Sequence, residues 1–190
     1  MASDIAAARL NMVESQVRTN DVTDVRIHDA MRRIPREAFA PAGKAYLAYA
    51  DSEIEYAPGR WLLKPRDIGK LLQALRPQPG ERALAIAAPY GAAVLEDLGL
   101  SVTRVDGEAL EPPAGAKFDL IICEGAVSRA PQSWLAALDL HGRLGVVERD
   151  GPVGRATVYV LASDGLGARP VFDATPPVLS GFAPEHGFAF

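Results

Sequence analysis

The feature that most constrains the fold of this chain is an alternation of strand-like and helix-like segments that begins after Pro79-Gly80. Short apolar runs of strand length are separated by segments whose apolar residues have helical spacing. This alternation is typical of a mostly parallel β-sheet with helices on its faces. We predict strands at Arg82–Ile86, Val102–Val105, Phe118–Cys123 and Arg143–Glu148, and helices at Ala92–Leu98 and around Trp134, Leu135 and Leu138, behind Pro131.

The segment after Gly151 has no helical spacing. We predict strands at Ala156–Ala162, Arg169–Phe172 and Gly187–Phe190. Two of these strands are expected to pair as an antiparallel hairpin at one edge of the sheet.

The first 78 residues are predicted to be mainly helical. Ser3 or Asp4 caps a first helix with Leu10, Val13 and Val17 on its apolar face, and Asp24 caps a second that Pro35 ends. The stretch from Pro41 to Pro65 is read as irregular, and a third helix follows at Arg66–Leu75. We therefore expect an N-terminal helical region (1–78) packed on a reduced α/β domain (79–190), together forming a single structural unit.

Composition excludes several classes of protein. A net charge of −4 and a pI near 5.4 argue against nucleic acid as the partner. No apolar run is long enough to span a membrane, and no secretory signal is visible at the N-terminus, so we expect a cytoplasmic protein without a membrane partner. The single cysteine, Cys123, excludes an internal disulfide and fits a reducing compartment.

The turn between the first predicted strand and its helix is Ala87-Ala88-Pro89-Tyr90-Gly91. In cofactor-binding α/β proteins this turn is rich in glycine, so that backbone N–H groups and the helix N-terminus approach the ligand closely. Here it has one glycine, and its proline removes a donor and fixes φ. The turn keeps the place of a binding site but has lost the residues that usually contact the ligand.

Few other residues are candidates for a catalytic, binding or metal-ligating role. Glu124 follows a predicted buried strand at its C-terminal end, where α/β proteins place functional groups, and a structural hydrogen bond to a neighbouring loop is the alternative. Cys123 is interpreted as a small buried hydrophobic residue. No metal site is expected, because the three histidines are isolated and no ligand spacing is present; they are His28, His141 and His186.

Two N-terminal blocks carry a family resemblance. They are Asn11-Met12-Val13-Glu14-Ser15-Gln16-Val17-Arg18 and Asp29-Ala30-Met31-Arg32-Arg33-Ile34-Pro35-Arg36-Glu37-Ala38-Phe39-Ala40-Pro41. Both resemble the N-terminal part of protein-L-isoaspartate O-methyltransferases, and the likeness continues in order along nearly the whole chain, through Pro79–Arg82, Phe118–Ile122 and Gly142–Leu144. The C-terminal part resembles a divergent bacterial branch. The resemblance implies a Rossmann-like class I fold that uses S-adenosylmethionine to methylate isoaspartyl carboxylates.

The chain departs from the pattern of that family at the cofactor loop and at the acceptor site. Ala85 replaces the acidic residue of the first motif, and the loop is two residues short, keeping only Gly91 of its glycines. Leu63 stands at the position of the serine implicated in catalysis, and a leucine can neither donate a hydrogen bond to the substrate carboxylate nor orient it. We interpret Leu62 and Leu63 as core residues, which leaves no catalytic residue assigned.

A third departure is a deletion. Only the 12 residues Gly107–Phe118 separate Asp106 from Asp119, whereas a βαβ crossover takes about 30 residues or more. One helix and one outer strand must be missing, with the wall that contacts adenine, so Val102–Val105 is predicted to be an edge strand. Asp106 stands where the family binds the ribose hydroxyls, and the alternative is a solvated aspartate at a strand end.

Two functions remain open. In the first, the chain is a degenerate methyltransferase homologue kept for protein binding or assembly, with Ala87, Tyr90, Gly91, Asp106 and Glu124 as vestigial cofactor-site positions. S-adenosylmethionine is then implied by resemblance only, and we expect no binding tighter than about millimolar. In the second, it is an active S-adenosylmethionine-dependent protein-repair enzyme. Candidate surfaces for a protein partner or a second copy are the predicted edge strand and the aromatics of Tyr46–Trp61.

Overall fold

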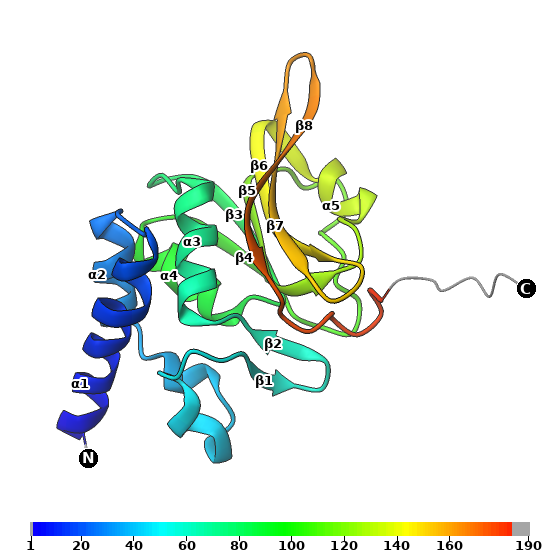
Figure 1. The fold of residues 1–190 in the computed structure, drawn as a ribbon. Helices are drawn as coiled ribbons and strands as arrows, with labels where there is room; N and C mark the ends of the chain where they lie inside the picture. Colours follow the sequence, from blue (N-terminus) through cyan, green and yellow to red (C-terminus); the bar gives the residue numbers. More distant parts are fainter. Residues whose placement is uncertain (1, 184–190) are drawn as a thin grey trace, which may run out of the picture.

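A six-stranded sheet forms the centre of the protein in a computed structural model that describes residues 2–183 (Figure 1). Its strand order is β4-β3-β5-β6-β7-β8. The strands are β3 (Arg82–Ile86), β4 (Ser101–Val105), β5 (Phe118–Val127), β6 (Leu138–Arg149), β7 (Gly154–Ala162) and β8 (Gly165–Ala174). The first four in spatial order are parallel, and β6, β7 and β8 follow as antiparallel neighbours. The predicted mostly parallel sheet with an antiparallel C-terminal hairpin is confirmed.

β4 is an edge strand, as the short connection after it predicts. Within residues 2–183, no strand pairs with β4 on its outer side. The segment between Asp106 and Phe118 crosses to β5 without a helix or strand, and buries Leu110 against the sheet. The missing outer strand and helix therefore leave β4 with one unpaired edge.

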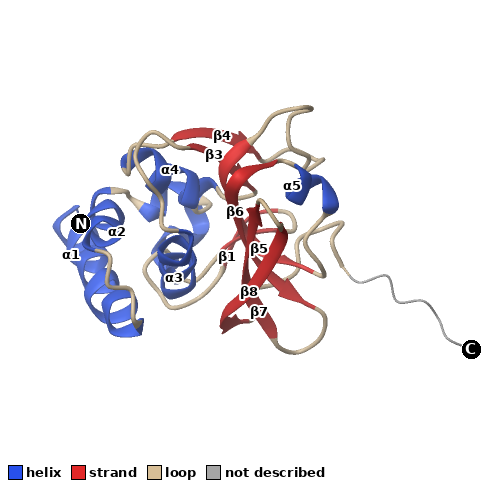
Figure 2. Cartoon of the chain, turned by 90° about the horizontal axis from the view of Figure 1, so that it is seen from above, coloured by secondary structure: helices blue, strands red, loops and turns tan. Residues whose placement is uncertain are grey.

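The helices lie mainly on one face of the sheet. Figure 2 shows α1, α2, α3 and α4 on that side and the short α5 on the other. Their bounds are α1 Ala2–Met12, α2 Val25–Arg33, α3 Pro65–Leu75, α4 Pro89–Asp97 and α5 Gln132–Ala136. On the helical face, one hydrophobic cluster combines buried residues from many elements, from Met12 in α1 to Ala174 in β8. A second cluster around Trp134 fills the opposite face.

The predicted cap is confirmed for α2 but not for α1, which begins at Ala2, so that Ser3 and Asp4 lie inside the helix. Asp24 caps α2, accepting a 2.9 Å hydrogen bond from the Arg26 N–H. α1 continues through a π-helical turn at Val13–Val17 into a short 3₁₀ turn at Arg18–Asn20. Leu10 is 51% exposed and does not join the buried face. The predicted apolar face was wrong there, because the inward face of α1 runs through Arg9 and Met12 instead.

The stretch predicted as irregular contains structure. Two short 3₁₀ helices, Arg36–Phe39 and Ala42–Leu47, precede an antiparallel hairpin of β1 (Ile54–Ala57) and β2 (Arg60–Leu62). Its turn is Pro58-Gly59, a pair that favours turns, with Gly59 at φ +67°. Of the aromatics in this stretch only Tyr46, at 79%, is largely exposed. The others pack partly against the core, so the expected exposed aromatic surface is not formed.

Several element bounds also need correction. β5 extends four residues beyond Cys123, so Glu124 lies inside the strand and not after it. α4 begins at Pro89, which shortens the turn to Ala87-Ala88 and puts Tyr90 and Gly91 in the first helical turn, since proline suits the first position of a helix. α5 ends before Leu138, which starts β6. The predicted strand at 187–190 lies outside the described residues.

None of the helices in the described part of the chain is both long and apolar enough to cross a membrane.

Candidate functional site

The candidate site lies at the carboxyl ends of β3, β4 and β5, the edge at which open α/β sheets bind ligands. The structure brings the predicted positions together here. Ala87 follows β3 and its N–H donates a 2.8 Å hydrogen bond to the carbonyl of Val105 at the end of β4. Ala87 has a φ of +45°, a left-handed conformation that a side chain disfavours. The backbone at this turn is thereby tied to the neighbouring strand.

The side chain of Glu124, from β5, meets the N-terminus of α4. Its Oε1 accepts a 2.6 Å hydrogen bond from the N–H of Gly91, in the first turn of the helix. Its Oε2 accepts a 3.1 Å hydrogen bond from the N–H of Leu63, which precedes α3. A helix N-terminus attracts anions through its free N–H groups and dipole. Here the anion that meets it is the protein's own carboxylate.

The Glu124 carboxylate is fully buried. Burial raises its pKa to about 7, because removal from water penalises the charged form. The guanidinium of Arg36 and the two backbone N–H groups act in the opposite direction and favour the carboxylate. Glu124 therefore titrates near neutral pH inside the protein.

Arg36 lies beside this carboxylate and is also fully buried. Its Nε donates a 3.0 Å hydrogen bond to the carbonyl of Ala48, and its Nη2 donates to the carbonyl of Leu63. The guanidinium stacks over the Tyr90 ring, 4.9 Å from the ring centre. Burial lowers the pKa of Arg36, while Glu124 acts to raise it. Arg36 thus joins three segments of the chain around Glu124.

Leu63, at the position of the family's serine, takes part through its backbone. Its N–H donates to Glu124 and its carbonyl accepts from Arg36. Its side chain, like that of Leu62, is fully buried in the core. The position therefore offers no side-chain donor to a bound carboxylate.

The β1–β2 hairpin covers the end of β4. The Tyr56 hydroxyl donates a 2.7 Å hydrogen bond to Oδ1 of Asp106. Arg60 Nη2 donates to the carbonyls of Gly107 and Glu108, at 3.2 and 3.4 Å. Asp106 is therefore an exposed aspartate at a strand end with a partner from the protein itself.

The C-terminal segment closes the other side. The Leu179 N–H donates a 2.7 Å hydrogen bond to the carbonyl of Ala126 in β5, and the Ser180 N–H reaches the carbonyl of Gly59 in the hairpin turn at 3.2 Å. Gly125 has a φ of +109°, and a Cβ there would lie 2.5 Å from the Leu179 side chain. A glycine is thus required where β5 meets this segment.

The space left between β3, β4 and α4 is small. A cavity of about 50 Å³ remains, lined by Ala85, Ala88, Pro89, Arg104 and Asp106. Sites for small molecules and cofactors usually measure about 300 Å³ or more. Because the cavity is far smaller and the helix N-terminus is engaged by Glu124, the residues present do not fit a nucleoside cofactor in this conformation.

The structure also places most of the remaining candidates. Cys123 is fully buried, and burial raises the pKa of its thiol. His28 is buried with its Nε2 2.7 Å from the carbonyl of Val22. His141 lies at a positive φ of +66°, while His186 is outside the described residues. Among residues 2–183, no group of three His, Cys, Asp or Glu side chains could hold a metal ion.

Sequence reasoning missed Arg36, Tyr56 and Arg60. The Pro58-Gly59 pair could have indicated the hairpin that carries Tyr56 and Arg60. Nothing in the sequence marks Arg36 as buried, because arginine is almost never fully buried unless it is paired.

Comparison with known proteins places this geometry in context. Residues 8–108 match the family model described as protein-L-isoaspartate(D-aspartate) O-methyltransferase (PCMT). A protein-L-isoaspartate O-methyltransferase of Methylorubrum extorquens (strain PA1) is 33% identical, over 85% of this chain and 82% of the relative.

Two solved structures share the fold. A protein-L-isoaspartate O-methyltransferase superposes with a TM-score of 0.73 at 18% identity, over 92% of this chain and 67% of the other. A Plasmodium falciparum PCMT in complex with S-adenosyl-L-homocysteine gives 0.74 at 13% identity, over 90% of this chain and 98% of the other.

Proposed function

The chain belongs to the protein-L-isoaspartate(D-aspartate) O-methyltransferase family, and from this premise we propose that it is a degenerate member. In this proposal it no longer binds S-adenosylmethionine and is kept for binding another protein or for assembly with its own copies. The proposed location is the cytoplasm, which suits a single buried, unpaired cysteine. Nucleic acid and membrane are not among the proposed partners.

The observation that carries the proposal is the hydrogen bond between Glu124 and Gly91. A cofactor with a carboxylate would compete for the same helix N-terminus, and it would have to displace a buried carboxylate held by two backbone N–H groups. Displacing Glu124 would also remove the negative charge that favours the buried Arg36 guanidinium, whose hydrogen bonds go only to the carbonyls of Ala48 and Leu63. Both costs oppose cofactor binding.

The position of Leu63, where the methyl-accepting carboxylate would bind, supports the same proposal. Leu63 supplies only backbone groups, and both are engaged inside the protein. Methyl transfer depends on alignment of the nucleophile with the methyl group, so the loss of a positioning side chain is costly. The retained fold, with an unpaired edge on β4, suits association because unpaired strand edges can pair with another chain.

The test is calorimetric titration of the full chain with S-adenosylmethionine and with S-adenosylhomocysteine. The Methylorubrum extorquens relative, titrated in the same buffer, shows whether the conditions support binding. We expect no dissociation constant below about 1 mM for this chain, which corresponds to about −4 kcal/mol. A micromolar dissociation constant would overturn the proposal and favour the alternative, an active protein-repair methyltransferase.

A second assay addresses activity directly. Transfer of a labelled methyl group to an isoaspartyl peptide should stay at the level without enzyme. Transfer well above that level would support the active alternative even if cofactor binding were too weak for calorimetry.

A further inference from the structure

A cleft of about 700 Å³ lies on the side of the molecule away from the site described above. It is bordered by the start of α2, the C-terminal half of α3 and β8, and its lining includes Arg26, Lys70, Arg76 and Arg169. A second hollow of about 420 Å³ also has Arg76 and Arg169 in its lining and reaches the outer residues of β7. The two hollows share Ala74, Arg76 and Arg169 in their lining, and together they are called the groove below.

Three cations of this groove make no ion pair or hydrogen bond within residues 2–183. All twenty Lys and Arg residues lie within residues 2–183. Only four of their side chains make neither a hydrogen bond nor an ion pair there, and three of the four line this groove: Lys70, Arg76 and Arg169. Lys70 has only a contact with the Phe172 ring, whose centre is 5.1 Å from its Nζ. The fourth such residue is Arg129.

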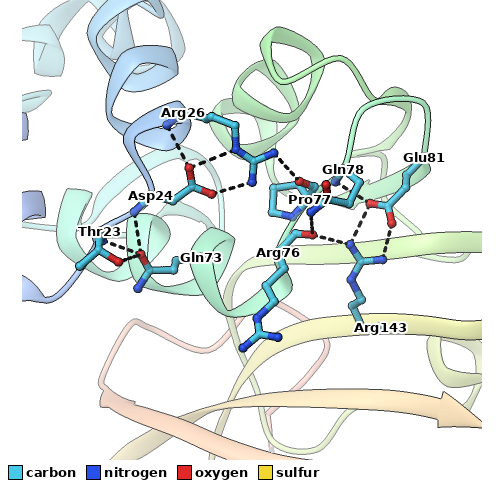
Figure 3. A network of polar contacts seen from close by, with 9 residues as sticks. All are labelled: Thr23, Asp24, Arg26, Gln73, Arg76, Pro77, Gln78, Glu81 and Arg143. Carbon is cyan, nitrogen blue, oxygen red and sulfur yellow. Dashed lines mark hydrogen bonds and ion pairs between the residues drawn. The ribbon is translucent and has the colours of Figure 1, made fainter.

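A hydrogen-bond network fixes the backbone around Arg76 and leaves its side chain free. Arg143 donates from Nη2 to the Arg76 carbonyl at 2.8 Å and forms an ion pair with Glu81. Arg26 is held by Asp24 and donates to the Pro77 carbonyl at 3.3 Å. Figure 3 shows the Arg76 side chain pointing away from this network, with no dashed line to its guanidinium.

The groove is positive although the whole chain is negative. The larger hollow is lined by four cations and two carboxylates, Asp21 and Asp24, and Asp24 is already engaged by Arg26. The smaller hollow adds Arg143, which is paired with Glu81. The chain carries a net charge of −4. Elsewhere in the described residues the Lys and Arg side chains are paired except Arg129, so the unpaired positive charge is concentrated in this groove. Charge complementarity between partners guides encounter and specificity.

We propose that this groove binds an acidic polypeptide segment of a partner protein. The inference deepens the proposed function and rests on it, because it names the chemistry of the protein partner. A polypeptide suits the groove because the cations are spread along the two hollows on three elements. A small-anion site would instead have buried donors converging on one point, and Arg76 and Arg169 are exposed. Nucleic acid is disfavoured by the acidic chain, and Lys70 already covers the aromatic ring of the groove.

The test uses a fluorescent decaglutamate peptide as probe and measures its anisotropy with the full chain at low and at high salt. We expect saturable binding at low salt that weakens with added salt, as screening requires. Arg169→Glu should weaken binding roughly tenfold or more. Arg129→Glu is the matched control, since it makes the same change of charge at the other unpaired cation, and it should leave binding within about twofold.

A second variant guards against misfolding. Lys70→Gln/Arg76→Gln/Arg169→Gln should abolish saturable binding while circular dichroism and the thermal midpoint stay near those of the wild type. If the triple variant does not fold, the comparison of Arg169→Glu with Arg129→Glu decides alone. No binding of the peptide, or equal loss in both single variants, would overturn the inference.

Two competition experiments distinguish an acidic peptide from the other classes of ligand. A deoxythymidine decamer that binds more tightly than the peptide would assign the groove to nucleic acid and overturn the inference. Inorganic phosphate that displaces the peptide where sodium chloride of equal ionic strength does not would assign it to a small anion, with the same consequence. The cofactor titration is independent, so a chain that binds both S-adenosylmethionine and the peptide would refute the proposed function but not the acidic-peptide groove.

Discussion

Glu124 in β5 and Gly91 in α4 are joined by a 2.6 Å hydrogen bond from the Gly91 N–H to the Glu124 carboxylate. They are 33 positions apart in the chain, and their contact puts an internal anion at a helix N-terminus. A Cβ at position 91 would lie 3.2 Å from the same carboxylate oxygen, so glycine permits the approach. This contact carries the functional proposal and also predicts how stability depends on pH.

The stability of the protein should fall as pH rises toward neutrality, because of Glu124. Burial raises its pKa from 4.5 to about 7, so between these values the folded state binds more protons than the unfolded state. Stability therefore decreases through this window and levels off above it, by up to about 3 kcal/mol. Thermal unfolding followed from about pH 5 to about pH 8 measures the change.

Glu124→Gln is the control for that prediction, because glutamine does not titrate. All other carboxylates are the same in both proteins, so the difference between the two profiles isolates Glu124. We expect the wild type to lose stability relative to the variant as pH rises. Parallel profiles would show that Glu124 has an ordinary pKa.

Arg36→Met should destabilise the protein by about 1–3 kcal/mol, since it removes the buried cation that favours the Glu124 carboxylate. It also removes the donors to the carbonyls of Ala48 and Leu63. Urea unfolding at neutral pH gives the value. Arg155→Met removes an exposed pair with Asp173 and should cost under about 1 kcal/mol.

The double variant Arg36→Met/Glu124→Gln should cost less than the sum of its single changes, because the two residues are coupled through one buried site. Strict additivity would mean that the two buried side chains do not interact.

Gly125→Ala should loosen the C-terminal segment. The change places a side chain at φ +109° and 2.5 Å from Leu179. Gly151→Ala is the matched control, since Gly151 has a φ of +126° and nothing within 4 Å of an added Cβ. Gly125→Ala should therefore cost about 1–3 kcal/mol more than Gly151→Ala by urea unfolding. Equal costs would indicate that only backbone strain matters and that the segment moves freely.

Restoring glycines to the cofactor turn should not restore methylation. In Ala87→Gly/Ala88→Gly/Pro89→Gly the Glu124 carboxylate still faces α4, and Leu63 still lacks a donor side chain. Labelled methyl transfer to an isoaspartyl peptide should stay at background, with the Methylorubrum extorquens relative as the positive reference. Recovery of methyl transfer in this variant would show that the changes in the turn are the only cause of lost activity.

Local patterns in the sequence predicted much of the architecture. The alternation after Pro79-Gly80 predicted the parallel sheet, and the 12 residues after Asp106 were too few for another βα unit, which made β4 an edge strand. Asp24 predicted the start of α2. These predictions succeed because spacing, capping and connection length act over a few residues, where backbone geometry alone decides the outcome.

The arrangement of the site was decided only by the tertiary structure. Glu124 contacts Leu63 across 61 positions, and Arg36 reaches the same residue across 27. In the sequence, Arg36 has the properties of a surface residue, and Glu124 was placed after a strand that in fact continues past it. Whether a charged side chain is buried depends on partners supplied by distant segments, and no local pattern records which segments meet. Hydrophobic periodicity and connection length thus determined the sheet and its edge strand. Long-range packing determined which side chains fill the site at the carboxyl ends of the strands.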